Sequence, residues 1–208
     1  NASSYVERAY DLGATDYISR PFDMAVVRRR VINTLMLYAK QKRLVRLVAE
    51  QVYEKEKSNS TMINILSHIV EFRNGESGMH VLHIQTATDI LLHTLVQKTD
   101  KYHLTAADIS LISTASALHD IGKINIPESI LNKPGRLTKE GYKGMKDHTT
   151  IGSEILEKLP FRQESDLVKT AYAICRWHHE RWDGRGYPDG LKGEQIPIAA
   201  QVVSMADV

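Results

Sequence analysis

Apolar residues recur three and four positions apart over most of the chain beyond residue 60, and alternating strand patterns are scarce. Such spacing places apolar side chains on one face of a helix, so it predicts an all-α core. Thr105 and Thr138 are each followed by acidic residues, which signals a helix start. The predicted helices cover about 61–73, 79–98, 105–121, 138–158 and 165–180.

Glycine and proline gather in two segments between these helices, at 126–137 and 183–197. Both residues break helices and favour turns. In an all-helical scaffold, loops of this kind are where backbone groups can approach a ligand. The two segments are therefore the candidate ligand-binding loops.

A long helix is predicted ahead of the core, because neither glycine nor proline occurs between Asp23, a favourable N-cap, and about Lys57. Its apolar stripe repeats every seven residues, with polar Thr34, Gln41 and Lys42 interrupting it. A homodimer through a coiled coil and a helix lying on its own domain both remain open. The charged segment 54–60 marks a boundary or hinge. The residues of the stripe are Val31, Leu35, Tyr38, Val45, Val48 and Val52.

The first residues predict a helix end at Gly13, a short strand and a turn at Pro21. The string at 9–22 resembles the last strand and helix of a response-regulator receiver domain, with Arg20 where that family has lysine. An unrelated helix and strand is the alternative. The resemblance covers about 35 residues, and the phospho-accepting aspartate would lie upstream of Asn1. We therefore expect a partial receiver-like α/β tail that does not itself receive a phosphate.

Composition narrows the class of protein. With 208 residues, 42% hydrophobic and 25% charged, the chain can bury one full domain and something smaller. It has neither an apolar run long enough for a membrane span nor a signal-peptide pattern, so a cytoplasmic setting is expected. A net charge of +2 with interspersed signs excludes a basic stripe for duplex nucleic acid but allows a small anionic ligand. The single cysteine, Cys175, is expected to pack in the core.

The candidate chemistry centres on His119 and Asp120, which follow the apolar run 109–118. Adjacent side chains on a helix diverge by about 100°, so such a pair serves two metals more easily than it chelates one. Alone, the pair could equally be a capped helix end. Further histidines and carboxylates bring the set to eight nitrogen and oxygen ligands: Glu76, His80, His119, Asp120, His148, His178, His179 and Asp207.

Eight ligands suit two or three metal ions better than one, because a zinc site takes only three or four protein ligands. No cysteine is among them, which favours iron or manganese over a thiolate-bound structural zinc. Zinc, nickel and magnesium are also compatible with imidazole and carboxylate ligands. We therefore expect two or three divalent ions as cofactors.

Residues 62–208 resemble the HD-GYP family, a branch of the HD metal-dependent phosphohydrolases. The resemblance rests on the order and spacing of motifs: Glu76 and His80, the string from His119 to Lys123, the string from Asn132 to Leu137, His148, the string from His178 to Pro188, and the trailing Ile196-Pro197 and Ala206-Asp207.

This resemblance implies an all-α HD-domain helical bundle with a GYP loop over 61–208, preceded by a connecting helix at 36–60 and the receiver-like remnant at 1–35. It also implies that the metals are bound by His80, His119, Asp120, His148, His178, His179 and Asp207. Family members with a glutamate four residues before the first histidine can hold a third ion, so Glu76 bears on the number of metals. A solvated helix residue is the alternative for Glu76.

The expected activity is hydrolysis of cyclic di-GMP to pGpG and onward to GMP, with other cyclic dinucleotides left open. Clustered metals would lower the pKa of a bound water near Asp120 and hold a phosphate oxygen, and Lys123, one turn beyond His119, can reach a phosphate or leaving oxygen. In the family, the GYP segment borders the substrate. The expected substrate contacts are Lys133, Arg136, Arg185, Gly186, Tyr187 and Pro188, with Glu180 a candidate for orienting a histidine.

Two other functions stay open at this point. One is a catalytically silent module that binds a nucleotide or partner, and the other is an HD phosphohydrolase acting on mononucleotides or alarmones. The chain stops at Val208, directly after Asp207, where the family continues through a helix with an Arg-Pro-Tyr string, so an incomplete site is also open. A sensor kinase or diguanylate cyclase is the expected partner of a longer parent protein.

Overall fold

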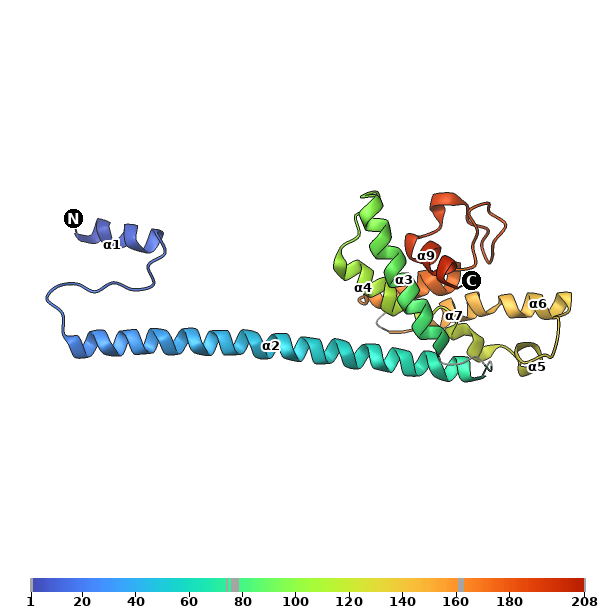
Figure 1. Ribbon diagram of the computed structural model, residues 1–208, viewed down its shortest axis with the longest axis horizontal. Coiled ribbons are helices and arrows are strands. Elements are labelled where there is room, and N and C mark those ends of the chain that lie inside the picture. Colours follow the sequence, from blue (N-terminus) through green and yellow to red (C-terminus); the bar gives the residue numbers. More distant parts are fainter. Residues whose placement is uncertain (1, 74, 76–78, 161–162, 208) are drawn as a thin grey trace. The chain divides into compact units, whose positions relative to one another are not determined.

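Helices form all the regular secondary structure in the described residues of the computed structural model, which are 2–73, 75, 79–160 and 163–207 (Figure 1). The all-α prediction is therefore confirmed over these residues. In chain order the elements are α1 (Ala2–Asp11), α2 (Met24–Arg73), α3 (Met79–Lys98), α4 (Ala106–Ser116), the 3-10 helix η1 (Ile121–Asn125), α5 (Glu128–Leu131), α6 (Lys139–Lys146), α7 (His148–Glu157), α8 (Asp166–Trp177), the 3-10 helix η2 (Gly193–Gln195) and α9 (Ile198–Ala206).

The chain divides into two compact units, Asn1–Glu56 and Lys57–Val208. The boundary lies inside the segment 54–60 that was predicted as a boundary or hinge. However, α2 runs through this segment without a break, because it holds neither glycine nor proline to stop a helix. The finer division at residue 35 stays a prediction.

In the first unit, the predicted α/β tail is wrong, since no strand occurs among its described residues. The chain leaves α1 and continues without regular structure through the predicted strand. Asp16 accepts a hydrogen bond from Arg30 (2.9 Å), and the Tyr17 carbonyl accepts another (3.2 Å). Strand formation needs a second strand to satisfy its backbone groups, and here an arginine side chain contacts this segment instead.

In the second unit, the hydrophobic core lies among α3, α4, α7, α8 and α9. α3 and α8 each pack against α4 and α9, and α7 packs against α8 and η1 (Figure 1). Cys175 is fully buried, and its thiol donates to the Leu118 carbonyl at 2.9 Å, in agreement with the predicted packing role. The buried core side chains include Ile84, Leu92, Ile109, Ile112, Ala115, Leu156, Ala171, Ile174, Val202 and Val203.

The end of α2 is tied to the segment that follows the His119-Asp120 pair. Arg73 donates hydrogen bonds to the backbone carbonyls of Lys123, Ile124 and Ile126. Earlier on the same helix, Ile63 packs with Val81 and Ala117. This helix end therefore supports η1, which lies directly beside the candidate site.

Two of the predicted helices are each divided in the structure. α4 starts where predicted, with Thr105 as N-cap and Asp108 completing a capping box, but it ends at Ser116 rather than 121. The predicted helix 138–158 is split at Asp147 into α6 and α7. Apolar spacing continues across both breaks, so the pattern alone does not reveal them.

None of the described helices is both long enough and apolar enough to cross a bilayer.

Candidate metal centre

The candidate ligands come from helix ends that converge in the second unit. His80 lies in the first turn of α3, and His148 begins α7. His119 and Asp120 lie in the turn between α4 and η1, and Asp207 follows α9. The pair His178-His179 directly follows α8. Helix ends place these side chains in one space without interrupting the hydrophobic core.

The ligand atoms form two groups of three. The first ligand group is His80, His119 and Asp207, and the second is His148, His178 and His179. Within each group the atoms lie within 4.8 Å of one another. The Nε2 atoms of His148 and His178 are 3.5 Å apart, and His80 Nε2 is 3.4 Å from Asp207 Oδ1. Two ligands at about 2.1 Å from one tetrahedral ion would be separated by about 3.4 Å.

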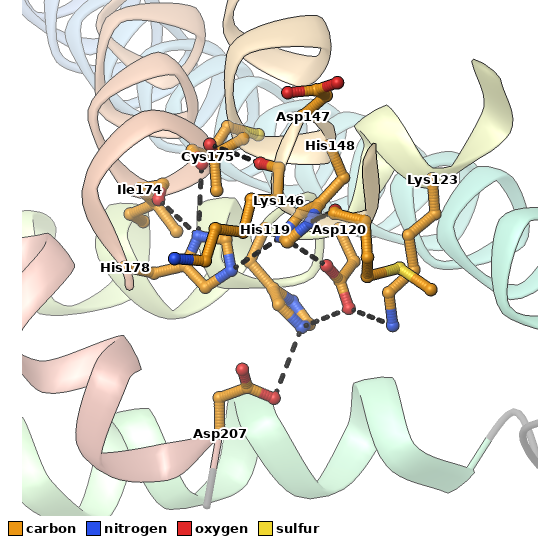
Figure 2. Close-up of polar contacts among 12 residues, drawn as sticks. His119, Asp120, Lys123, Lys146, Asp147, His148, Ile174, Cys175, His178 and Asp207 are labelled. Carbon is orange, nitrogen blue, oxygen red and sulfur yellow. Dashed lines mark hydrogen bonds and ion pairs between the residues drawn. The ribbon is translucent and has the colours of Figure 1, made fainter. Parts of the chain in front are cut away.

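Asp120 lies between the two groups (Figure 2). Its Oδ2 is 3.2 Å from His119 Nε2, and its Oδ1 is 3.3 Å from His148 Nε2. One carboxylate thus turns one oxygen to each ligand group. A carboxylate placed in this way could serve ions held by both groups, and its role as a shared ligand stays a prediction.

The buried histidines are oriented by backbone carbonyls. Nδ1 lies 2.9 Å from the Ser116 oxygen in His119, 2.7 Å from the Met145 oxygen in His148, and 2.9 Å from the Ile174 oxygen in His178. A carbonyl can only accept, so we assign a proton to each Nδ1. Each Nε2 is thereby directed into the centre as the atom available to a metal.

Two polar atoms at the centre fit a cation. His119 Nε2 and Asp120 Oδ1 are buried and make no hydrogen bond of good geometry with any described residue. Buried polar groups without such a bond are rare and costly. A bound cation would satisfy both, so the residues present fit the group that the ligand set implies.

Charge at the centre also favours metal binding. Burial holds the pKa of His178 well below its usual range and lowers that of His179 to about 4. Both are therefore neutral at neutral pH, as ligation requires. Burial opposes ionisation of Asp120, but His119 and Lys123 lower its pKa well below the usual range. Burial opposes protonation of His119, but Asp120 and Asp207 raise its pKa to about 9, so metal binding there would release a proton.

Lys123 lies beside the Asp120 carboxylate, and its predicted contact with a phosphate or leaving oxygen stays a prediction. Its Nζ lies 2.7 Å from Asp120 Oδ2. A charge-assisted contact of this length fixes the orientation of the carboxylate. The lysine side chain is also mostly buried, with 15% of its surface exposed, so it contributes its charge where water screens it little.

The loop that follows α8 packs directly on the second ligand group. The ring of Tyr187 stacks on that of His179 with centroids 4.8 Å apart, and the Tyr187 N–H donates to the His179 carbonyl. At Gly186 a Cβ would fall 2.4 Å from the Glu180 Cα, so only glycine allows this approach. Of the predicted substrate-loop residues, Tyr187 thus lies against a ligand histidine, and Gly186 lies against the backbone that follows that histidine.

Glu180 has a different role from the predicted one of orienting a histidine. Its Oε1 accepts hydrogen bonds from the backbone N–H groups of Asp189 (2.7 Å) and Gly190 (2.9 Å). Asp189 in turn accepts from Arg176 and from the Trp177 indole. The buried Glu180 carboxylate therefore holds the loop that follows α8 against the end of that helix. No local sequence pattern indicates these pairings, because they join residues nine or more positions apart.

The structure connects the other residues predicted to bind substrate or metal less closely to the two ligand groups. Lys133, Arg136 and Arg185 are exposed, and no contact joins their side chains to the ligand groups in the described part of the chain. Pro188 is half-buried next to Tyr187. Glu76 lies outside the described residues, so its predicted metal role stays a prediction. Sequence reasoning missed Lys146, whose ammonium lies 4.6 Å from the centre of the Tyr187 ring.

Comparison with known families shows which family the domain that carries these ligands belongs to. A model of the HD domain family matches residues 60–208, which include every described ligand. The chain belongs to the HD domain family. An HD domain implies divalent metal binding, and the two ligand groups are where this HD domain can hold the ions.

Curated relatives of this HD domain protein are named as phosphodiesterases. A "Probable cyclic di-GMP phosphodiesterase" of Vibrio cholerae is 35% identical over 96% of this chain and 47% of its own length. The "Cyclic di-GMP phosphodiesterase response regulator RpfG" of Xanthomonas campestris is 33% identical over 97% of this chain and 52% of its own. A "3'3'-cGAMP-specific phosphodiesterase 2" of Vibrio cholerae is 38% identical over 74% of this chain and 27% of its own. The chain therefore spans about half or less of these relatives, and their names support the HD-GYP branch of the family.

Proposed function

We propose that this chain is a metal-dependent phosphodiesterase that hydrolyses cyclic di-GMP to linear pGpG and onward to GMP. The observation that carries the proposal is the position of Asp120, with one oxygen facing each of two groups of metal ligands. The similarity to cyclic di-GMP phosphodiesterases over nearly the whole chain supports the choice of substrate.

The two ligand groups support two ions per chain, and iron or manganese suits ligands that are imidazole and carboxylate without thiolate. A third ion with Glu76 as ligand stays part of the proposal. Bound divalent ions supply charge neutralisation and a water of lowered pKa. Residues of the chain would orient the water, contact the phosphate and bind the base or ribose of the substrate.

Asp120 has two oxygens at the middle of the cluster, so its carboxylate can accept a hydrogen bond from the attacking water and orient it. Lys123 holds that carboxylate in place through its 2.7 Å contact. A lysine ammonium beside the cluster can also donate a hydrogen bond to a phosphate oxygen or to the departing alkoxide. The Tyr187 ring presents an aromatic surface beside His179, on which a base or ribose of the substrate can pack.

Substrate turnover tests this proposal. Protein loaded anaerobically with iron or manganese is incubated with cyclic di-GMP, 3'3'-cGAMP, pGpG or a mononucleotide, and products are separated by ion-exchange chromatography. We expect cyclic di-GMP to disappear with pGpG as first product, and the His80→Ala variant to lose this turnover while His83→Ala, an exposed histidine one turn away, keeps it. Metal-loaded protein that hydrolyses none of the four would favour the silent binding module.

The second candidate substrate is 3'3'-cGAMP, favoured by the similarity to a phosphodiesterase specific for it. Both cyclic dinucleotides present the same phosphodiester to the metal ligands, so the cluster does not separate them. A kcat/KM for 3'3'-cGAMP above that for cyclic di-GMP would make it the preferred substrate.

We also propose a homodimer through α2. Its heptad-spaced Val31, Tyr38, Val45 and Val52 are each at least 50% exposed, and apolar residues at this spacing are typical of a two-stranded coiled coil. Sedimentation equilibrium should give twice the 23.5 kDa chain mass. The double variant Val45→Asp, Val52→Asp should be monomeric, while Gln51→Asp stays dimeric. A monomeric wild type would contradict the proposal. A sensor kinase or diguanylate cyclase partner stays a prediction.

A further inference from the structure

Lys146 is a half-buried lysine beside the metal-ligand cluster that the reaction proposed above does not use. It ends α6, two residues before the ligand His148. In Figure 2 its side chain lies across the histidine group, whereas the carboxylate of Asp147 points away from that group. The position differs from that of Lys143 on the same helix, which is exposed.

Two aromatic rings hold the ammonium of Lys146. Its Nζ lies 4.8 Å from the centre of the Tyr142 ring and 4.6 Å from that of Tyr187. Tyr187 stacks in turn on the ligand His179. Tyr142 lies four residues before Lys146, one turn away on α6, and Tyr187 belongs to the loop after α8. The ammonium is therefore positioned from two separate elements.

This environment positions the charge without neutralising it. No carboxylate pairs with Lys146 among the residues that the structure describes, in contrast to Lys123, which lies 2.7 Å from Asp120. Aromatic faces attract a cation by their quadrupole but leave its N–H groups free to donate. A half-buried ammonium held in this way is a favourable site for an anion.

The location of the charge indicates which anion it serves. Lys123 contacts the Asp120 carboxylate, which the function proposed above places beside the scissile phosphate. Lys146 lies at the second ligand group, where its ammonium contacts the Tyr187 ring that stacks on His179. A cyclic dinucleotide carries a second phosphodiester, which needs a cation away from the point of hydrolysis.

We propose that Lys146 is a substrate-binding residue that contacts the second, non-scissile phosphate of the cyclic dinucleotide. The inference rests on the phosphodiesterase function proposed above. It assigns to this position a role in recognising a substrate with two phosphates rather than a role in the chemistry at the metals.

The test compares two substrates in the metal-loaded full chain. Cyclic di-GMP has two phosphodiesters, and bis(4-nitrophenyl) phosphate has one. We expect Lys146→Met to lower kcat/KM for cyclic di-GMP by about 10- to 100-fold, the effect of losing a charged hydrogen bond, mainly through KM. Hydrolysis of bis(4-nitrophenyl) phosphate should stay within about twofold of wild type, since its lone phosphate binds at the metals.

Matched variants separate binding from folding. Lys143→Met removes an exposed lysine from the same helix and should leave both reactions unchanged. Lys146→Arg should restore most of the cyclic di-GMP activity, and all three variants should keep the wild-type metal content. The KM of wild type should rise with salt more steeply than that of Lys146→Met, because the variant has lost one contact to an anion.

Each result has a distinct meaning. Equal losses on both substrates, or no loss on either, would overturn the role of Lys146. If wild type hydrolyses bis(4-nitrophenyl) phosphate but not cyclic di-GMP, the proposed substrate fails instead, and the comparison is repeated with 3'3'-cGAMP.

Discussion

The Asp120→Asn variant is expected to lose turnover of cyclic di-GMP by about 1,000-fold or more, which corresponds to about 4 kcal/mol in activation free energy. Asparagine keeps the size of the side chain but removes its negative charge and replaces one carboxylate oxygen with an NH2 group that cannot bind a cation. Because the two Asp120 oxygens face separate ligand groups, the change removes the shared ligand of the centre. Turnover measured by product chromatography, with enzyme in excess over substrate, would detect the residual rate.

The matched control is Asp147→Asn, which removes an exposed carboxylate whose side chain points away from the cluster (Figure 2). Its turnover should lie within about twofold of wild type. Wild-type activity in the Asp120→Asn variant would show that this carboxylate does not take part in the reaction, and the proposed role of Asp120 would have to be withdrawn.

The Gly122→Ala variant is expected to lose metal and to unfold more easily. A Cβ at this position would lie 1.9 Å from the carbonyl oxygen of His148 and 2.5 Å from the Gly152 nitrogen. Both are backbone atoms, so α7 must move away from η1 and carry His148 away from Asp120. We expect a loss of about 3 kcal/mol in unfolding free energy, or about 6–12 °C in Tm.

Gly144→Ala is the comparison for this substitution. Its new Cβ would meet only the Ile130 Cδ1, at 3.0 Å, and that atom is the end of a flexible side chain. Because alanine also favours a helix, stability should change by less than about 1 kcal/mol. Calorimetry and metal analysis of the two variants check the prediction, and a Gly122→Ala protein with wild-type Tm and metal content would contradict the close packing of η1 on α7.

Much of the fold could be predicted from local patterns. Apolar spacing predicts the core helices, and Thr105 predicts the start of α4, because both depend on residues within a few positions of one another. The breaks at Ser116 and Asp147 were not predicted. They depend on how α4, η1, α6 and α7 pack, which a continuous apolar pattern does not record. The short strand predicted between Gly13 and Pro21 was wrong because a strand depends on a partner as much as on its own sequence.

The same difference between local patterns and long-range contacts applies to the candidate site. The ligand residues could be proposed from the order of His and Asp motifs, and the structure brings all the described ones together. The contacts of the side chains that support these ligands could not be proposed from such motifs. Glu180 binds the backbone of Asp189 and Gly190, and Lys146 contacts Tyr187 across about forty residues of sequence. Neither residue differs in its local sequence from an ordinary surface charge.

The most direct measurement is the metal content of anaerobically purified wild type and Asp120→Asn protein, determined by elemental analysis on samples whose turnover is also measured. The account predicts at least two ions of iron or manganese per wild-type chain, a third if Glu76 binds one, and a lower content in the variant. Wild-type protein that turns over cyclic di-GMP with less than one ion per chain would contradict the proposal that the two ligand groups form the centre of the reaction.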